Sequence, residues 1–168
     1  IREGEINFVH LHLHSCYSLR DSIIKPNELA VRLQEIGQST VAITDHGGAL
    51  GAVLLYKELK AAGIKMIYGV EAYTCDDAKI KDKNNKYYHL VLLAKNETGR
   101  INLNRLITIS ERPENKYYKP RIDLDILREH KDGLIVLSAC LAGEVSKRLM
   151  ADDYDGANAT NVERCYFN

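Results

Sequence analysis

The sequence predicts an α/β fold, and three observations lead to it. Short apolar runs rich in β-branched residues alternate along the chain with longer segments of helical periodicity. Polar residues capable of chemistry follow several of these runs, as they do at the strand ends of parallel sheets. The 168 residues are 45% hydrophobic and 27% charged, which suffices for one folded domain with a core. Strands separated by helices imply parallel pairing, so we expect a parallel sheet.

The first half of the chain contains three predicted strands and two predicted helices. Residues 8–14 are expected to form a strand because apolar side chains and histidines alternate there. Pro26 suits the first turn of a helix, and Gly37 suits its end. The remaining elements are a buried strand at 40–44, a helix at 49–62 and a strand at 65–73.

The second half continues this alternation. Residues 76–87 are polar and charged, which predicts a solvated loop, and residues 111–122 contain two prolines and predict a second, longer loop. The other expected elements are strands at 89–94 and 134–138 and helices at 97–110, 123–130, 142–151 and 155–165.

Charge and cysteine content narrow the classes of function. The 23 basic and 23 acidic residues cancel, so bulk charge does not predict a nucleic-acid binder, although a metal cluster would supply its own local charge. No apolar run is long enough for a transmembrane helix, so we expect no membrane partner. The four cysteines form no CxxC motif and no secretory signal opens the chain, which favours a reducing cytoplasm over a disulfide framework.

Three histidines, His10, His12 and His14, alternate along the first predicted strand. On a strand they would share one face, and imidazole is the commonest metal ligand among side chains. A single histidine is more often a hydrogen-bonded core or surface residue. Three on one face of an apolar strand are harder to explain in that way, because burying three unpartnered polar rings is costly. The stretch therefore predicts a metal site.

Further polar residues follow the later strands. Asp45 and His46 come directly after the strand at 40–44, where His46 could bind a metal and Asp45 could orient a ligand ring, although the same residues also suit a turn. Glu71 is a carboxylate inside an apolar strand, either bound to a metal or at a solvated edge. His89 and Cys140, taken singly, are more readily explained as structural residues.

Six motifs, in order, carry a resemblance to a known family: HLHLHSCYSLRDS, AITDHG, GVEAY, HLVLLAKN, YKPRIDLDIL and LSACLAGE. They resemble the PHP (polymerase and histidinol phosphatase) domain, in the form found in the bacterial DNA polymerase III alpha subunit. The resemblance covers nearly all of residues 1–168 and implies one PHP domain with a distorted TIM-like β/α barrel. It also implies a cluster of up to three metal ions, usually zinc or manganese.

The resemblance implies a ligand for each matching motif position. Glu71 would bridge two ions, and His10 would occupy a supporting position without being a primary ligand. The residues implied to be catalytic are His12, His14, Glu71 and His89. The residues implied to bind metal are His12, His14, Asp21, His46, Glu71, His89 and Cys140, with Asp21 and His46 assigned to the third ion.

One family motif is missing from the sequence. PHP domains close their metal cluster with an Asp-x-His near the last strand, and no such pair follows residues 159–162 here. We therefore expect the chain to stop before the last strands of the barrel, with two ligands absent. The resulting unpaired sheet edge predicts marginal stability, a partner that covers the edge, or a rearranged end.

The implied activity is metal-dependent phosphoester hydrolysis of the 3′–5′ exonuclease type, or structural support of the polymerase. DNA would be reached through the parent polymerase, with the rest of the alpha subunit and other replisome subunits as partners. Two alternatives remain open. One is a stand-alone phosphatase of the histidinol-phosphatase type, and the other is a non-catalytic docking domain stabilised by metal.

Overall fold

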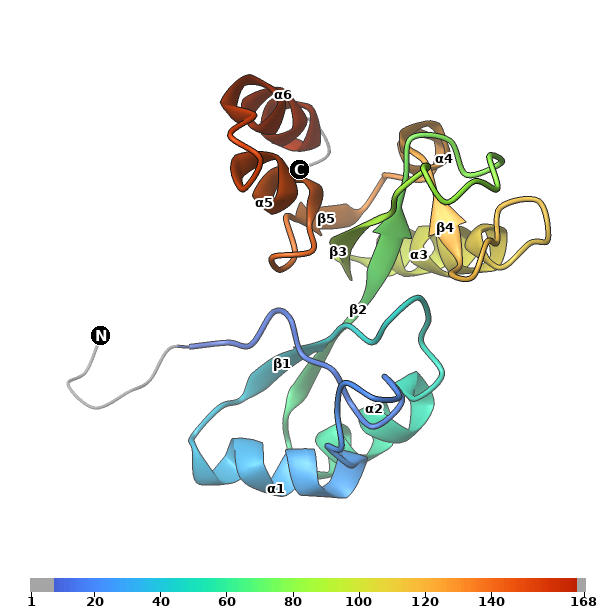
Figure 1. Cartoon of the computed structure of the whole chain (residues 1–168). Helices are drawn as coiled ribbons and strands as arrows, with labels where there is room; N and C mark the ends of the chain where they lie inside the picture. The colour runs from blue at the N-terminus through green and yellow to red at the C-terminus, as the bar shows by residue number, and fades with distance from the viewer. Residues whose placement is uncertain (1–7, 166–168) are drawn as a thin grey trace.

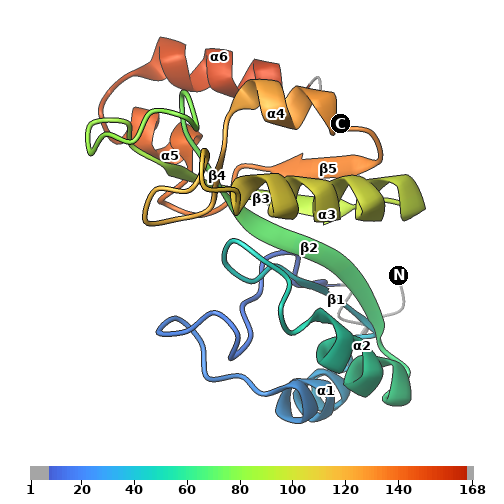
Figure 2. The same cartoon turned by 90° about the vertical axis from the view of Figure 1, so that its right-hand side faces the viewer.

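The computed structural model describes residues 8–165 and shows a mixed α/β fold. Figure 1 shows its elements, and Figure 2 shows them after a quarter turn. In chain order these are α1 (Pro26–Glu35), β1 (Thr40–Ile43), α2 (Ala52–Ala61), β2 (Lys65–Thr74), β3 (Tyr88–Ala94), α3 (Glu97–Ser110), β4 (Arg121–Ile122), α4 (Leu124–Glu129), β5 (Leu134–Leu137), α5 (Glu144–Leu149) and α6 (Tyr154–Cys165).

The long strand β2 organises the sheet, whose order is β1-β2-β3-β5 with β4 beside β2. Its first residues pair in parallel with β1, from Lys65 opposite Thr40 to Tyr68 opposite Ile43. Its later residues, 69–74, pair antiparallel with β3. Figure 2 shows β2 running between the part of the fold that contains α1 and α2 and the part that contains α3. Strand β2 therefore connects the two parts of the sheet.

Gly69 marks the point where β2 exchanges one partner for the other. A Cβ atom at this position would lie 2.7 Å from Leu93 Cδ2 and 3.0 Å from both the Leu92 carbonyl oxygen and Thr44 Cγ2. Strands from both parts of the sheet approach the backbone closely here, so only glycine fits. Glu71 follows two residues later.

Two main hydrophobic clusters form the core, one on each side of this junction. The first contains Leu33, Val41 and Leu55 and lies where α1 and α2 pack on β1. The second contains Leu92 and Leu103 and lies where α3 packs on β3, β5 and β4. A small cluster of Ala42, Val91 and Leu93 joins them. The functional residues described below lie between two well-packed bodies.

The predicted helices and most predicted strands are present, but the expectation of a fully parallel sheet is wrong. The β2–β3 and β3–β5 pairs are antiparallel. Strands β2 and β3 are joined by the polar loop 75–87 without a crossover helix, so the chain simply turns back along the sheet. The second predicted loop, 111–122, also ends in the short strand β4, which pairs with β2 in parallel.

The predicted strand at 8–14 is also wrong. His10 forms only an isolated bridge with Val41, and the segment runs beside β1 without regular pairing. The Ala42 amide donates to the His10 carbonyl and the Thr44 amide donates to the Leu13 carbonyl. The three residue steps from His10 to Leu13 therefore lie opposite only two steps from Ala42 to Thr44, so the pairing is irregular. The Thr44 hydroxyl bonds the Leu13 backbone as well, which replaces a ladder hydrogen bond.

No helix within residues 8–165 combines the length and apolar character needed to cross a membrane.

Candidate metal centre

Glu71 lies at the centre of the candidate site. Its side chain is 1% exposed, although it carries a carboxylate. The Glu71 amide donates to the Asp45 carbonyl, and the Gly47 amide donates to the Glu71 carbonyl, so the segment after β1 is held against β2. His46 forms a bridge directly opposite Glu71. This pairing brings the Asp-His turn predicted from sequence onto the buried carboxylate.

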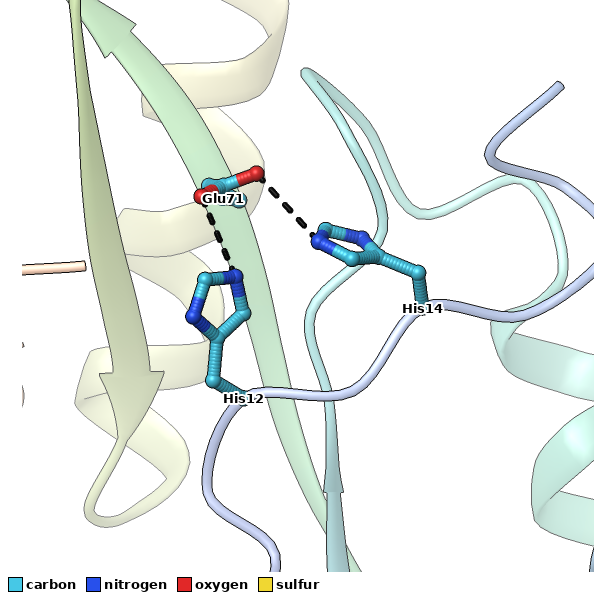
Figure 3. Close-up of side chains that lie close together, drawn as sticks. All are labelled: His12, His14 and Glu71. Atoms are coloured by element: carbon cyan, nitrogen blue, oxygen red, sulfur yellow. Dashed lines mark ion pairs between the residues drawn. The ribbon is translucent and has the colours of Figure 1, made fainter. Parts of the chain in front are cut away.

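Four imidazoles surround the Glu71 carboxylate. His12 Nε2 lies 3.0 Å from Oε1 and His14 Nε2 lies 3.4 Å from Oε2. Figure 3 shows both rings turned towards the Glu71 carboxylate. On the other side, His46 Nδ1 lies 2.7 Å from Oε2 and His89 Nδ1 lies 3.1 Å from Oε1. His12, His14 and His46 come from the part of the fold that contains β1, and His89 comes from β3. The site therefore closes only when both parts of the sheet are folded.

These nitrogens and oxygens form two groups of potential ligands, both including Glu71. The first is His12, His14 and Glu71, and the second is His46, Glu71 and His89, with donor atoms within 4.8 Å of one another in each group. Two atoms bound to one tetrahedral zinc ion at about 2.1 Å lie about 3.4 Å apart, close to the observed separations. The donor set therefore fits divalent metal ions.

The tautomer of His14 supports this fit. Ser18 Oγ donates its only hydroxyl proton to Asp45 Oδ1 at 2.6 Å, and it also lies 3.2 Å from His14 Nδ1. Ser18 can therefore only accept a hydrogen bond from Nδ1, because its single hydroxyl hydrogen is already directed at Asp45. In the neutral ring the lone pair of Nε2 then faces the Glu71 carboxylate. Two acceptors facing each other are complementary to a cation between them.

Unpaired buried atoms give a second reason to place a cation here. His12 Nε2, His46 Nδ1 and Glu71 Oε2 are buried and have no hydrogen-bond partner. Some of these atoms lie close to an ion-pair partner, yet their angles do not suit hydrogen bonding. Leaving buried polar atoms unsatisfied costs about 1–3 kcal/mol each. Ligation to a metal would satisfy all three.

The groups of the site shift one another's pKa values. Burial opposes ionisation of Glu71, yet in the metal-free protein the surrounding histidines, when they carry a proton towards the carboxylate, outweigh burial and hold the pKa of its carboxyl well below its usual range. The nearby Glu71 and Asp21 carboxylates raise the pKa of His46 above its ordinary value despite partial burial. The carboxylate is therefore ionised at neutral pH, as a metal ligand must be.

Asp21 and Cys140 lie at the margins of the cluster. Asp21 is 56% exposed, and its Oδ2 lies 2.5 Å from His46 Nε2. Cys140 Sγ lies 3.7 Å from Glu71 Oε1 and 3.8 Å from His89 Nδ1, and it accepts from the Ala142 amide. The structure thus brings the other six predicted ligands together at Glu71, five of them beside its carboxylate and Asp21 through His46. His10 instead contacts Gln38, with 2.7 Å between Nδ1 and Oε1.

Comparison with known proteins shows the family. The profile of the PHP domain matches residues 10–164, which is most of the chain. The chain belongs to the PHP domain family.

Two curated relatives of this PHP domain carry the same description. A DNA polymerase III subunit alpha from Borreliella burgdorferi is 44% identical over 154 residues, which cover 89% of this chain and 13% of that protein. The one from Helicobacter pylori strain J99 is 46% identical over 143 residues, covering 84% of this chain and 12% of that protein. The chain therefore spans only about an eighth of the length of these relatives.

Among solved structures, an amidohydrolase from Chromobacterium violaceum is similar at 22% identity and a TM-score of 0.41. The match covers 58% of this chain and 32% of that one.

Sequence reasoning about the PHP domain missed the residues behind the cluster. Ser15 donates to Asp45 from both its amide and its hydroxyl, at 2.7 Å each, and Ser18 completes the set. Asp45 was expected to orient a ligand ring, and it acts on His14 through Ser18. Both serines lie in the first PHP motif, but a serine pattern alone does not reveal a hydrogen-bond partner thirty residues away.

A cavity of about 650 Å³ opens beside the cluster of this PHP domain, and Asp21 and His46 line it. The Tyr73 ring stacks beside His46, with centroids 5.9 Å apart, and Lys119 Nζ lies 5.1 Å from the centre of the Tyr73 ring. Both residues also line the cavity. A molecule entering here would meet candidate metal ligands on one side and a cation on the other.

Proposed function

We propose that this PHP domain forms part of a bacterial DNA polymerase III alpha subunit and hydrolyses phosphoesters with metal ions bound around Glu71. The observation that carries the proposal is the arrangement of four imidazoles around one buried carboxylate. Among them, the neutral His14 ring directs the lone pair of Nε2 at the Glu71 carboxylate. The relatives named as alpha subunits support the polymerase context.

The ligands divide between the two groups that share Glu71. His12 and His14 would hold one ion and His89 a second, with Glu71 bridging them. Cys140, beside His89 and Glu71, would complete the second ion as a thiolate, which favours a soft ion such as zinc over manganese. His46 belongs to the second group through Nδ1, and its other nitrogen, Nε2, would hold a third ion together with Asp21.

Bound ions would neutralise phosphate oxygens and lower the pKa of a bound water to generate the nucleophile. Residues of this chain would position the metal ligands and attract the substrate. Ser18 and Asp45 fix the ring of His14, so that Nε2 faces the cluster. Lys119 supplies a positive charge at the cavity wall, where it would attract a phosphate. In the parent polymerase, DNA would reach the site, and the rest of the alpha subunit and other replisome subunits would be the protein partners.

The test compares metal content with hydrolysis. The purified chain would be stripped with EDTA, reloaded with zinc or manganese, and assayed for bound ions per chain. Release of mononucleotides from the 3′ end of single-stranded DNA would be assayed beside hydrolysis of histidinol phosphate. We expect at least one ion per chain and nucleotide release that Glu71→Gln abolishes, while Glu58→Gln on the exposed face of α2 behaves as the parent protein.

Each other outcome has a defined meaning. Fewer than about one ion per chain would overturn the metal centre. Bound metal with hydrolysis of histidinol phosphate alone would assign the domain to the phosphatase class. Bound metal without hydrolysis of either substrate would leave the ions a stabilising role in a docking domain.

A further inference from the structure

A second cavity lies outside the metal centre. Its volume is about 660 Å³, and its walls come from the loop 75–87, the segment leading into β4, and the region of α5. The mechanism proposed above uses none of the residues that line it. Its lining contains five cationic and two acidic residues, although the chain as a whole is neutral.

Most of the positive charge in this cavity is uncompensated. Of the two acidic residues, Asp153 already pairs with Arg148 at 2.8 Å. The structure of residues 8–165 shows no ion pair for Lys83, Lys86 or Lys147, and all three are exposed. Three free ammonium groups around one hollow create a positive potential that attracts an anion.

Arg121 adds a buried positive charge beneath the same cavity. Its side chain is 0% exposed, and its guanidinium donates to the backbone carbonyls of Asn115, Ala78 and Ile80. Arg121 Nη1 is buried and has no acceptor. Within the described part of the chain, no carboxylate pairs with this guanidinium. Because no acidic side chain of the described residues neutralises it, the guanidinium adds to the positive potential beneath the cavity.

Four tyrosines line the cavity together with these cations. Tyr118 is 86% exposed and has a backbone φ of 57°, a left-handed conformation that a bulky residue rarely adopts. Its ring contacts that of Tyr117, with centroids 4.6 Å apart, and Tyr117 lies over the Arg121 guanidinium at 5.3 Å. The fold thus holds an exposed aromatic ring above the basic cavity in a strained conformation, which points to a binding role.

We propose that this cavity binds a nucleotide, with its phosphate attracted by the lysines and Arg121 and its base stacked on Tyr118. Free cations beside exposed aromatic rings are the combination that binds single-stranded nucleic acid without sequence preference. The cavity adjoins the metal centre through Tyr87, whose ring lies nearly parallel to that of His89 with centroids 6.4 Å apart. The nucleotide could belong to a single strand or be a free mononucleotide.

Fluorescence anisotropy with a labelled dT12 oligonucleotide tests the proposal on the full 168-residue chain. All titrations are run in EDTA at several salt concentrations, so binding does not depend on the metal centre. We expect the triple variant Lys83→Ala/Lys86→Ala/Lys147→Ala to bind at least tenfold more weakly. The slope of log affinity against log salt should also fall by about 2, since each phosphate contact to a single strand contributes about 0.7. Tyr118→Ala should weaken binding between about fivefold and a hundredfold.

Matched controls lie on the other part of the fold. The triple variant Lys57→Ala/Lys60→Ala/Lys65→Ala removes the same charge from exposed sites, and Tyr56→Ala removes an exposed tyrosine. Both should bind dT12 as the parent does. Equal losses in the test and control variants, or no binding of dT12 or dTMP to the parent at low salt, would overturn the proposal.

Unlabelled dTMP distinguishes the two sources of the nucleotide. If dT12 binds far more tightly than dTMP and both lose affinity in the cavity variants, the ligand is a strand. If dTMP binds as tightly as dT12, the ligand is a free mononucleotide. A chain that binds dT12 in EDTA but fails to hydrolyse DNA with metal would refute the proposed hydrolysis and leave this site intact.

Discussion

Ser18 Oγ lies 3.2 Å from His14 Nδ1, and this contact decides which nitrogen of His14 faces Glu71. Because the Ser18 hydroxyl donates its only hydrogen bond to Asp45, it can only accept a hydrogen bond from the histidine ring. Metal-binding histidines generally use such a partner to fix the ring and its tautomer. The relationship leads directly to a first prediction.

Ser18→Ala should weaken zinc binding about 10- to 100-fold, because His14 loses the acceptor that fixes its tautomer. Competition with a chromophoric zinc chelator measures the affinity. Long-range ¹⁵N–¹H NMR of the imidazoles in the metal-free protein should show one His14 tautomer in the parent and a mixture in the variant. Ser22→Ala is the control, because Ser22 lies in the same loop and its hydroxyl accepts from the nearby Ile24 amide and not from a ligand ring. Unchanged affinity with a mixed tautomer would disprove the positioning role.

Glu71→Gln should reduce zinc affinity by at least about 100-fold, because both groups of potential ligands lose their shared carboxylate. It should also remove the stabilisation that zinc gives the parent, about 2.7 kcal/mol when free zinc is 100 times the dissociation constant. Thermal unfolding with and without zinc measures this difference, and Glu58→Gln provides the control. A full zinc-induced shift in the Gln variant would contradict the bridging role.

The thiols should react at very different rates. Burial raises the pKa of Cys75 to about 11, so about one thiol in a thousand is ionised at pH 8. Cys140 is exposed. Iodoacetamide labelling followed by peptide mass spectrometry should therefore modify Cys140 before Cys75 in the metal-free chain. Zinc should protect Cys140 and leave Cys75 unchanged, and faster labelling of Cys75 than of Cys140 would contradict the burial argument.

Gly69→Ala should destabilise the fold by about 1–3 kcal/mol, because the added methyl group meets Leu93 and the Leu92 carbonyl at the junction of the sheet. Urea unfolding in EDTA measures the effect without any contribution from metal. Gly48→Ala, where a Cβ meets nothing within 4 Å, should change stability by less than about 0.5 kcal/mol. Equal stability of the two variants would contradict the prediction, because it would show that the sheet adapts to the added methyl group at little cost in stability.

The amino-acid pattern predicted the helices well, because helix periodicity and end signals are local. Pro26 begins α1, and α3 has the predicted bounds. The pattern also drew attention to His12, His14, His46 and Glu71, since histidines and a carboxylate within or directly after apolar runs are conspicuous in one dimension, whereas Asp21, His89 and Cys140 were implied only by the family resemblance. Glu71 is the clearest case, because an apolar strand rarely carries a buried acid without a partner.

Tertiary structure decided the direction of β3, the irregular path of residues 8–14 and the role of Ser18. Strand direction depends on how the chain returns after β2, and the loop 75–87 turns it back antiparallel. The segment at 8–14 alternates like a strand, but the Thr44 hydroxyl takes over part of its pairing. The role of Ser18 and the existence of the cavity beneath Tyr118 depend on contacts between residues far apart in sequence. Alternation and residue type reveal which groups can do chemistry, whereas only the folded chain places their hydrogen-bond partners.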